Sequence, residues 1–223
     1  MELGRILNDS LGYGKDIVWG KWVRWILLIF CTLFFPLVLG YEVEIYRGNK
    51  PAPDWCRLER FFTDGLKLLV IEIIYAIPTL LVMLVFIGAG LFALRSPAGA
   101  MAMWGAFAVG FVITLIVAFI TFLVEAMGVV RFARTGEFGE AFNFHAIFGR
   151  IGQIGWGSYI LALLVVCIIA GVIAIVLSAI PLIGWLLLLI VLPPLVIFVA
   201  QFITLVYDGV PAEAPPAAAP PAA

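Results

Sequence analysis

The sequence has few charged residues and long segments that contain none. Only 12% of its 223 residues are charged, whereas soluble domains typically carry about 25%. Residues 151–207 include no Asp, Glu, Lys, Arg or His. Because a membrane-spanning helix needs about 20 apolar residues, this segment is long enough for two spans and a turn. The scarcity of charge excludes a soluble globular domain and indicates an integral membrane protein.

The alternation of polar and apolar residues that β-barrel strands require is also missing. Residues 161–166 are continuously apolar, so the predicted fold class is an all-α polytopic membrane bundle. The basic residues form no clustered surface, which argues against a nucleic-acid partner. Mixed charges precede the first apolar run near Trp25, and no small-residue cleavage site follows it. We therefore expect no cleaved signal peptide.

Cysteine and histidine are too few for a metal site or a disulfide framework. Cys31, Cys56 and Cys167 lack CxxC spacing, and their odd number favours reduced thiols. His145 is the only histidine and has no Cys or carboxylate cluster beside it. The glycines of residues 149–157 are not followed by the Lys-Ser/Thr of a phosphate loop. No nucleophile, base and acid occur together, so we predict no enzymatic activity, no cofactor and no metal.

Four long apolar segments predict four spans, at about residues 66–94, 101–130, 158–180 and 184–207. Proline and glycine near residues 95–99 and 180–184 predict the two tight turns that join them in pairs. All seven tryptophans lie at an edge of an apolar segment or in a polar one. This placement is typical of rings that favour the membrane–water interface.

Three amphipathic segments predict helices that lie on the membrane surface. They are residues 54–66, residues 138–151 and a weaker segment near residues 3–17. The alternative is that they are loops packed on the bundle. Each is followed by apolar sequence that ends in a short polar signature containing glycine. Residues 54–136 and 138–209 are then two copies of one unit, and residues 2–48 a shortened third copy. We expect one membrane domain over residues 1–210 and a disordered Pro/Ala tail at residues 211–223.

The segment between Trp22 and Arg47 fits either one span or a re-entrant hairpin bent near Pro36. The two predicted hairpins place most basic residues on one side, which the positive-inside bias makes cytoplasmic. The N-terminus is also basic and favours the same side, which a single crossing would prevent. The hairpin is therefore favoured, with the basic loops and the C-terminus on the cytoplasmic side of the cell membrane.

Two glutamates interrupt otherwise apolar spans. Glu72 and Glu125 each lie about one to two turns from the predicted cytoplasmic edge, where a charge is costly and often functional. They could form a proton or cation site, or simply pair with bases such as Lys67 and Arg131. Gln201 could hydrogen-bond between helices. Three prolines also interrupt the spans: Pro78, Pro193 and Pro194. They could kink the helices or mark a substrate site.

Several basic and glycine-containing motifs recur at the polar ends of the spans. These interfacial candidates are Arg47, Gly48, Trp55, Arg57, Arg60, Asp64, Gly65, Lys67, Arg131 and Arg134. Where the surface segment meets the span, Gly65 would permit a sharp turn and Asp64 could cap the helix. We interpret this motif as architectural.

These motifs resemble those of a membrane family catalogued as domain of unknown function 4013. The matching residues are Gly40-Tyr41, Arg47-Gly48, Pro51-Ala52-Pro53-Asp54-Trp55, Phe62, Asp64-Gly65-Leu66-Lys67, Tyr75 and Pro78, with a weaker match at Arg131, Arg134-Thr135-Gly136 and Ala141-Phe142. The resemblance implies a multi-spanning protein without an assigned activity, found mainly in archaea and in some bacteria. It supplies no catalytic residues.

The sequence supports two hypotheses for function. The first is a non-enzymatic protein that organises membrane lipid, another membrane protein or a second copy of itself through its basic amphipathic cytoplasmic face. The alternative is a small transporter or channel that uses the kinked helices with Glu72 or Glu125.

Overall fold

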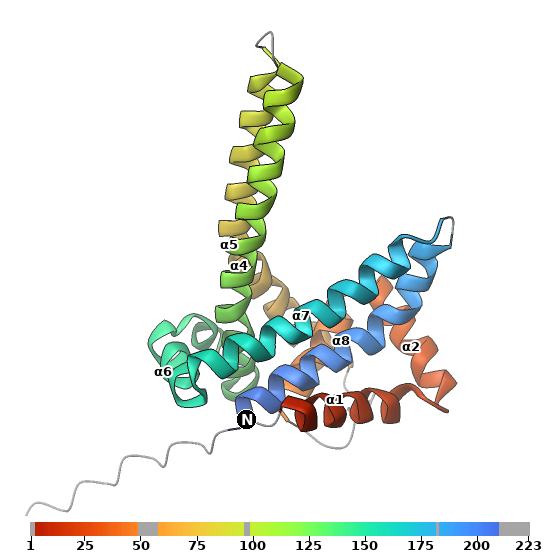
Figure 1. The fold of residues 1–223 in the computed structure, drawn as a ribbon. Coiled ribbons are helices and arrows are strands. Elements are labelled where there is room, and N and C mark those ends of the chain that lie inside the picture. The colour runs from red at the N-terminus through yellow and green to blue at the C-terminus, as the bar shows by residue number, and fades with distance from the viewer. Residues whose placement is uncertain (1–2, 49–57, 96–98, 182, 210–223) are drawn as a thin grey trace, which may run out of the picture.

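The computed structural model describes residues 3–48, 58–95, 99–181 and 183–209. Apart from one short 3-10 helix, the elements of this part of the chain are all α-helices (Figure 1). They are α1 (Leu3–Val18), α2 (Trp22–Leu33), α3 (Phe35–Tyr46), α4 (Leu58–Ala93), α5 (Gly99–Thr135), η2 (Phe138–Phe142), α6 (Phe144–Ile154), α7 (Trp156–Ser178) and α8 (Gly184–Asp208). Four of them, α4, α5, α7 and α8, are long and apolar enough to cross a membrane. The predicted all-α fold with four spans is confirmed.

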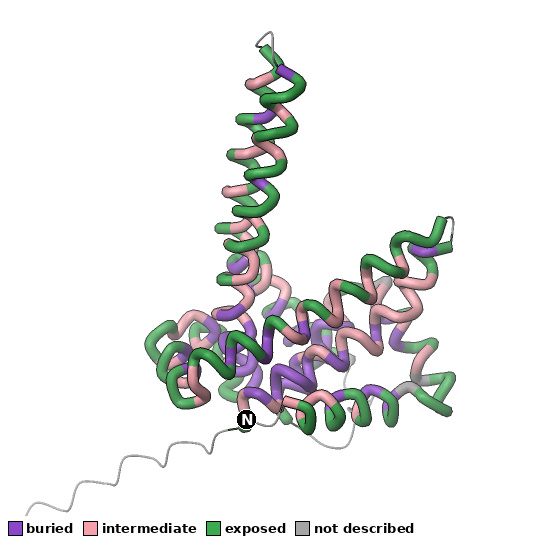
Figure 2. Tube along the Cα trace, viewed as in Figure 1, coloured by how far each residue is buried: buried purple, intermediate pink, exposed green. Residues whose placement is uncertain are grey.

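Two helical hairpins diverge from a common base (Figure 1). We call residues 76–95 and 99–122 the first arm, residues 167–181 and 183–192 the second arm, and the other described residues the base. Buried residues gather in the base, while the first arm is mostly exposed and the second arm is mostly partly buried (Figure 2). Among the described arm residues, only glycines are buried. A Cβ on Gly90 or Gly110 would come within 2.3 or 2.4 Å of a phenylalanine ring of the opposite helix, so small residues let α4 and α5 pack closely.

Helix α4 differs from the prediction of a separate surface helix at residues 54–66. It runs without a break from Leu58 to Ala93, about 54 Å at 1.5 Å per residue. This exceeds the roughly 30 Å of a hydrocarbon core, so its first turns belong to the base. Gly65 lies inside the helix and makes no turn, and Asp64 does not cap it. The predicted positions 54–57, with Trp55 and Arg57, and the tail at 211–223 lie outside the described residues.

The other amphipathic segments are helical, with differences in detail. Residues 138–154 form η2 and α6, separated at Asn143, whose side chain accepts a hydrogen bond from the Ala146 amide and so caps α6. Helix α1 continues without a break through Gly12 and Gly14. Gly14 lies close to α8. A Cβ added to Gly14 would be 3.9 Å from the carbonyl oxygen of Pro194.

The segment at residues 22–47 forms two short helices rather than one continuous span. Helices α2 and α3 meet at Phe34, just before Pro36 in the first turn of α3. Each has 12 residues, about 18 Å, which is too short to cross the hydrocarbon core alone. The break lies where the re-entrant alternative places its bend.

Candidate functional site

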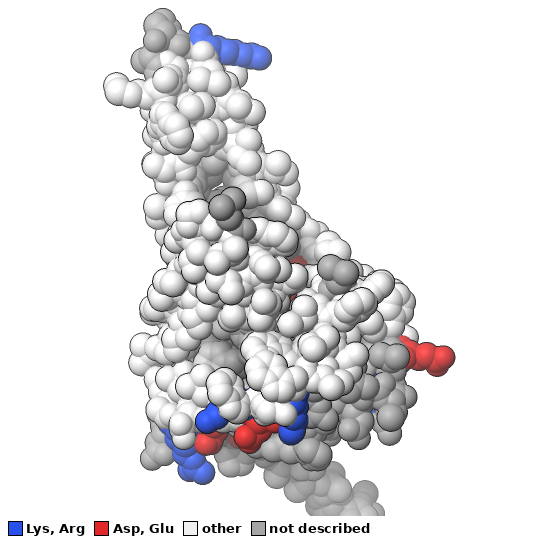
Figure 3. Space-filling view, turned by 90° about the vertical axis from the view of Figure 1, so that its right-hand side faces the viewer, with Lys and Arg blue, Asp and Glu red and all other residues white. Residues whose placement is uncertain are grey.

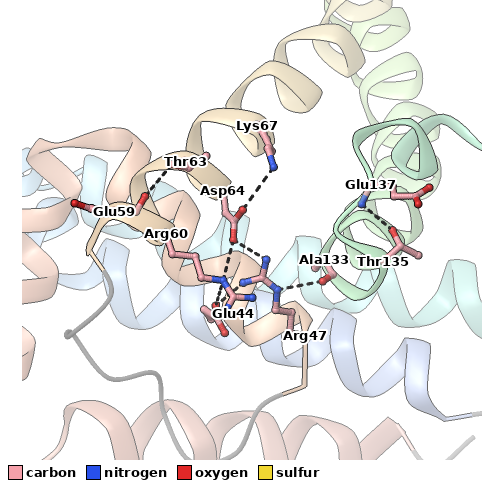
Figure 4. A network of polar contacts seen from close by, with 10 residues as sticks. All are labelled: Glu44, Arg47, Glu59, Arg60, Thr63, Asp64, Lys67, Ala133, Thr135 and Glu137. Carbon is pink, nitrogen blue, oxygen red and sulfur yellow. Dashed lines mark hydrogen bonds and ion pairs between the residues drawn. The ribbon is translucent and has the colours of Figure 1, made fainter.

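An ion-pair cluster joins α3, α4 and α5 in the base (Figure 4). Arg47, just after α3, contacts the carboxylate of Glu44 and donates to Asp64 Oδ2 at 2.6 Å. Its Nε also donates to the Ala133 carbonyl of α5 at 3.2 Å. Arg60 lies 3.6 Å from both carboxylates, and Lys67 lies 4.0 Å from Asp64. Three cations therefore surround two buried carboxylates and tie three helices together.

The helices α3 and α4 cross beside this cluster at two glycines. A Cβ on Gly40 would lie 1.9 Å from the Phe61 carbonyl oxygen, and one on Gly65 would lie 1.8 Å from that of Pro36. Only glycine permits such a close backbone approach. The approach places Asp64, the neighbour of Gly65, where Arg47 can reach it. The Asp64-Gly65 motif thus serves helix packing and ion pairing, a different structural role from the predicted turn and cap.

A second arginine connects the ends of α3, α5 and α8. Arg134 donates through Nε to the Tyr46 carbonyl at 2.8 Å, and its Nη2 lies 2.8 Å from Asp208 Oδ2. Gly48 has φ +75°, and a Cβ there would lie 2.7 Å from the Arg134 Nη2. Nearby, Arg150 of α6 donates to the Tyr207 carbonyl and stacks on its ring. The three polar signatures of the sequence therefore meet in the base.

The charged side chains of the base are largely neutralised by one another. Figure 3 shows both signs of charge gathered there, and above them an arm that carries no charge along its length and one basic side chain at its tip. Arg131 pairs with Glu140, and hydrogen bonds from Asn143 and then Arg131 lower the pKa of Glu140. Lys67 pairs with Asp64, and Arg131 pairs with Glu140. In this structure, neither of these two basic side chains forms an ion pair with Glu72 or Glu125.

Those two glutamates instead line a cavity of about 200 Å³ together with Glu42. Glu42 comes from α3, Glu72 from α4 and Glu125 from α5, and Val199 and Ile203 of α8 form another wall. No ion pair to any of the three carboxylates occurs within the described ranges. Glu42 hydrogen-bonds to the Tyr46 side chain, one helical turn along α3. This cavity is the candidate functional site.

The pKa of Glu42 reflects these surroundings. The helix α3 is not one of the four candidate spans. Burial raises the pKa of Glu42 well above its ordinary value, and the nearby carboxyls of Glu72 and Glu125 raise it further. The hydrogen bond from Tyr46 opposes this shift but is the smaller effect. The cavity therefore favours a proton on Glu42 when no cation is present.

The remaining candidates lie elsewhere. Gln201 is buried in α8 but does not line the cavity. Pro194 removes the amide that would bond the Ile190 carbonyl, and the Trp25 indole donates to that carbonyl at 3.1 Å instead. His145 is exposed, and no group of three metal-ligating side chains occurs among the residues that the structure describes.

The sequence analysis named Glu72 and Glu125 as candidates but not Glu42, which the structure places in the same cavity. Its position depends on the glycine crossing of α3 and α4, which joins segments separated by undescribed residues. A signal was nevertheless present, because Glu42 and Tyr46 are four residues apart and share one face of a helix. Two tyrosine hydroxyls also anchor the base, from Tyr75 to the Ala141 carbonyl and from Tyr159 to the Leu123 carbonyl.

The four apolar helices and the polar base define a polytopic helical membrane protein. A family model described as "Protein of unknown function (DUF4013)" matches residues 25–182, more than half of the chain. The chain belongs to this family. Searches of curated proteins and of solved structures found no match.

Proposed function

We propose that this protein is a small, non-enzymatic membrane transporter or channel that binds a proton or small cation in the acidic cavity. The observation that carries the proposal is the convergence of Glu42, Glu72 and Glu125 on one cavity without an ion-pair partner among the described residues. The alternative formulated from the sequence involved only Glu72 and Glu125, and the structure adds Glu42.

Electrostatics supports this proposal. Three carboxylates in about 200 Å³ repel one another, and burial removes the water that would otherwise stabilise their charge. Either bound protons or a bound cation must offset most of this negative charge. A site that exchanges one for the other is what a coupled transporter needs.

The arrangement of the walls provides a way to link occupancy to movement. Three walls come from the ion-paired unit of α3, α4 and α5, and the fourth comes from α8 of the other hairpin. Because the two hairpins diverge beyond the base, α8 could move against the α3–α5 unit without breaking their internal packing. Loss of charge in the cavity would bring its walls together.

Organisation of lipid or a partner through the basic face is the second candidate function. It is favoured by three exposed rings along α6 and the start of α7: Phe144 stacks on Phe148, and Phe148 lies next to Trp156 in a tilted arrangement. However, five basic side chains of the base already pair with carboxylates: Arg47, Arg60, Lys67, Arg131 and Arg134. Little positive charge remains on them for an anionic partner.

We also propose that the base lies on the cytoplasmic side of the cell membrane and that the N-terminus lies on the same side. The basic residues of the base support this orientation. Reporters at residues 1 and 97 should then label from opposite sides. Labelling from the same side would mean that residues 22–47 cross the membrane once.

The transport proposal is tested by proton flux in proteoliposomes that contain a pH-sensitive dye, with sodium, potassium or no added cation gradient. We expect flux in the wild type and loss of at least tenfold in E72Q and E125Q. The control is E137Q, which removes an exposed carboxylate outside the cavity and should retain flux. Equal flux in all four proteins, or none under any gradient, would overturn the proposal.

A further inference from the structure

A second cavity lies on another face of the base, between α1, α2 and α8. It measures about 440 Å³ and is lined mainly by apolar groups, including Leu11, Trp25, Pro194 and Phe198. Its size falls within the range of about 300–1,000 Å³ that is typical of ligand sites. We call it the α1–α8 groove.

A hydrogen bond and a ring stack hold Trp25 in the wall of the groove. Pro194 leaves the Ile190 carbonyl without its helical donor, and the Trp25 indole supplies a hydrogen bond in its place. The Trp25 ring also stacks on Trp22, with 5.5 Å between ring centroids. The proline kink of α8 thus fixes an aromatic side chain against an otherwise open apolar surface.

The cations at the groove differ from those elsewhere in the base. Lys15 lines the groove, and Lys21, two residues beyond the lining residue Trp19, does not line it but donates to the Asp16 carbonyl at 2.9 Å. Within the described part of the chain, neither lysine forms an ion pair with a carboxylate, in contrast to Arg47 and Arg134. Both lysines are exposed, so their charge is available to a ligand.

The position of the groove fits the membrane–water interface. The side chains of Trp19 and Trp22 are 76% and 67% exposed, and tryptophan rings favour the interface. An apolar groove with Lys15 in its lining, a cation that has no ion pair among the described residues, matches a molecule that has acyl chains and an anionic headgroup.

We propose that the α1–α8 groove binds one anionic phospholipid. Its acyl chain lies against Trp25, Pro194 and Phe198, and its phosphate-containing headgroup contacts Lys15 and Lys21. The occupant is a lipid rather than a protein helix, because the apolar lining includes Lys15, which has no ion pair among the described residues. The inference is independent of the acidic cavity.

The test is native mass spectrometry of the detergent-purified protein after titration with dioleoyl phosphatidylglycerol or dioleoyl phosphatidylcholine. The wild type should retain phosphatidylglycerol preferentially. The variants K15Q and K21Q should each reduce that preference about fivefold, the effect of one basic residue at an anionic surface. The variant G14L should reduce retention of both lipids, because its side chain enters the groove.

The matched control is R95Q, which removes an exposed cation at the far end of α4 and should leave the preference unchanged. Circular dichroism and size exclusion would establish that each variant is folded. Equal retention of the two lipids by the wild type would overturn the proposal, as would a preference that survives K15Q and K21Q together. A dimer that carries no lipid and is lost in G14L would assign the groove to a second copy instead.

Discussion

The base and the two arms differ in what stabilises them. The base holds almost all the buried side chains, the ion pairs of Arg47 and Arg134, and the acidic cavity. The arms are apolar helices whose side chains mostly face outward and whose buried described positions are glycines. In a membrane, lipid tails are as apolar as leucine, so exposed arms carry no hydrophobic penalty. The buried contacts that hold the fold together therefore lie in the base, where an apolar core surrounds a few ion pairs.

The largest effect should follow from removing Arg47. The variant R47A would leave the buried carboxylates of Glu44 and Asp64 without their closest cation, which typically costs about 3–5 kcal/mol. At about 2–4 °C per kcal/mol, we expect the Tm in detergent to fall by roughly 10 °C. The control R5A breaks the exposed 3.9 Å pair with Asp9 and should change the Tm little. Equal Tm values for both variants would mean that the base does not depend on its ion pairs.

The next largest effect should come from the glycine crossing. In G65A the new Cβ would meet the Pro36 carbonyl oxygen, and such overpacking typically costs about 1–3 kcal/mol. The control G88A lies in the same helix in open space, where alanine should stabilise by up to about 1 kcal/mol. Thermal unfolding in detergent would measure both. A G65A protein as stable as G88A would show that α3 and α4 do not need this close approach.

Sequence patterns predicted the arms much better than the base. Long apolar runs bounded by Pro and Gly specify spans such as α7 and α8 almost by themselves. The base depends on contacts between residues far apart in the chain, such as Arg47 with Ala133 or Arg134 with Asp208, which no local pattern encodes. For the same reason Glu72 and Glu125 could be recognised as unusual, while Glu42 could not be placed beside them.

A smaller, pH-dependent effect should distinguish the cavity from the rest of the base. Because the pKa of Glu42 is raised in the folded protein, its contribution favours folding below the ordinary pKa of 4.5 and is lost as pH rises toward the raised value. We expect E42Q to match the wild type near pH 4 and to exceed its Tm at pH 8. Each unit of raised pKa corresponds to about 1.4 kcal/mol. The control E59Q changes an exposed carboxylate and should follow the wild-type pH profile. If the Tm of E42Q followed the same pH profile as that of the wild type, burial would not disfavour the charged form of Glu42.

The smallest effect should come from shortening an exposed side chain of the first arm. A matched substitution in the base then measures how far the two regions differ. Ile71 and Leu84 belong to the same helix, but Ile71 is 0% exposed and Leu84 is 60% exposed. The variant I71A should lose about 2–5 kcal/mol, whereas L84A should change stability by less than about 0.5 kcal/mol. Chemical unfolding in mixed micelles would measure the pair. If L84A were as costly as I71A, the first arm would be packed against another protein chain rather than lipid, and its exposed surface would be an interface.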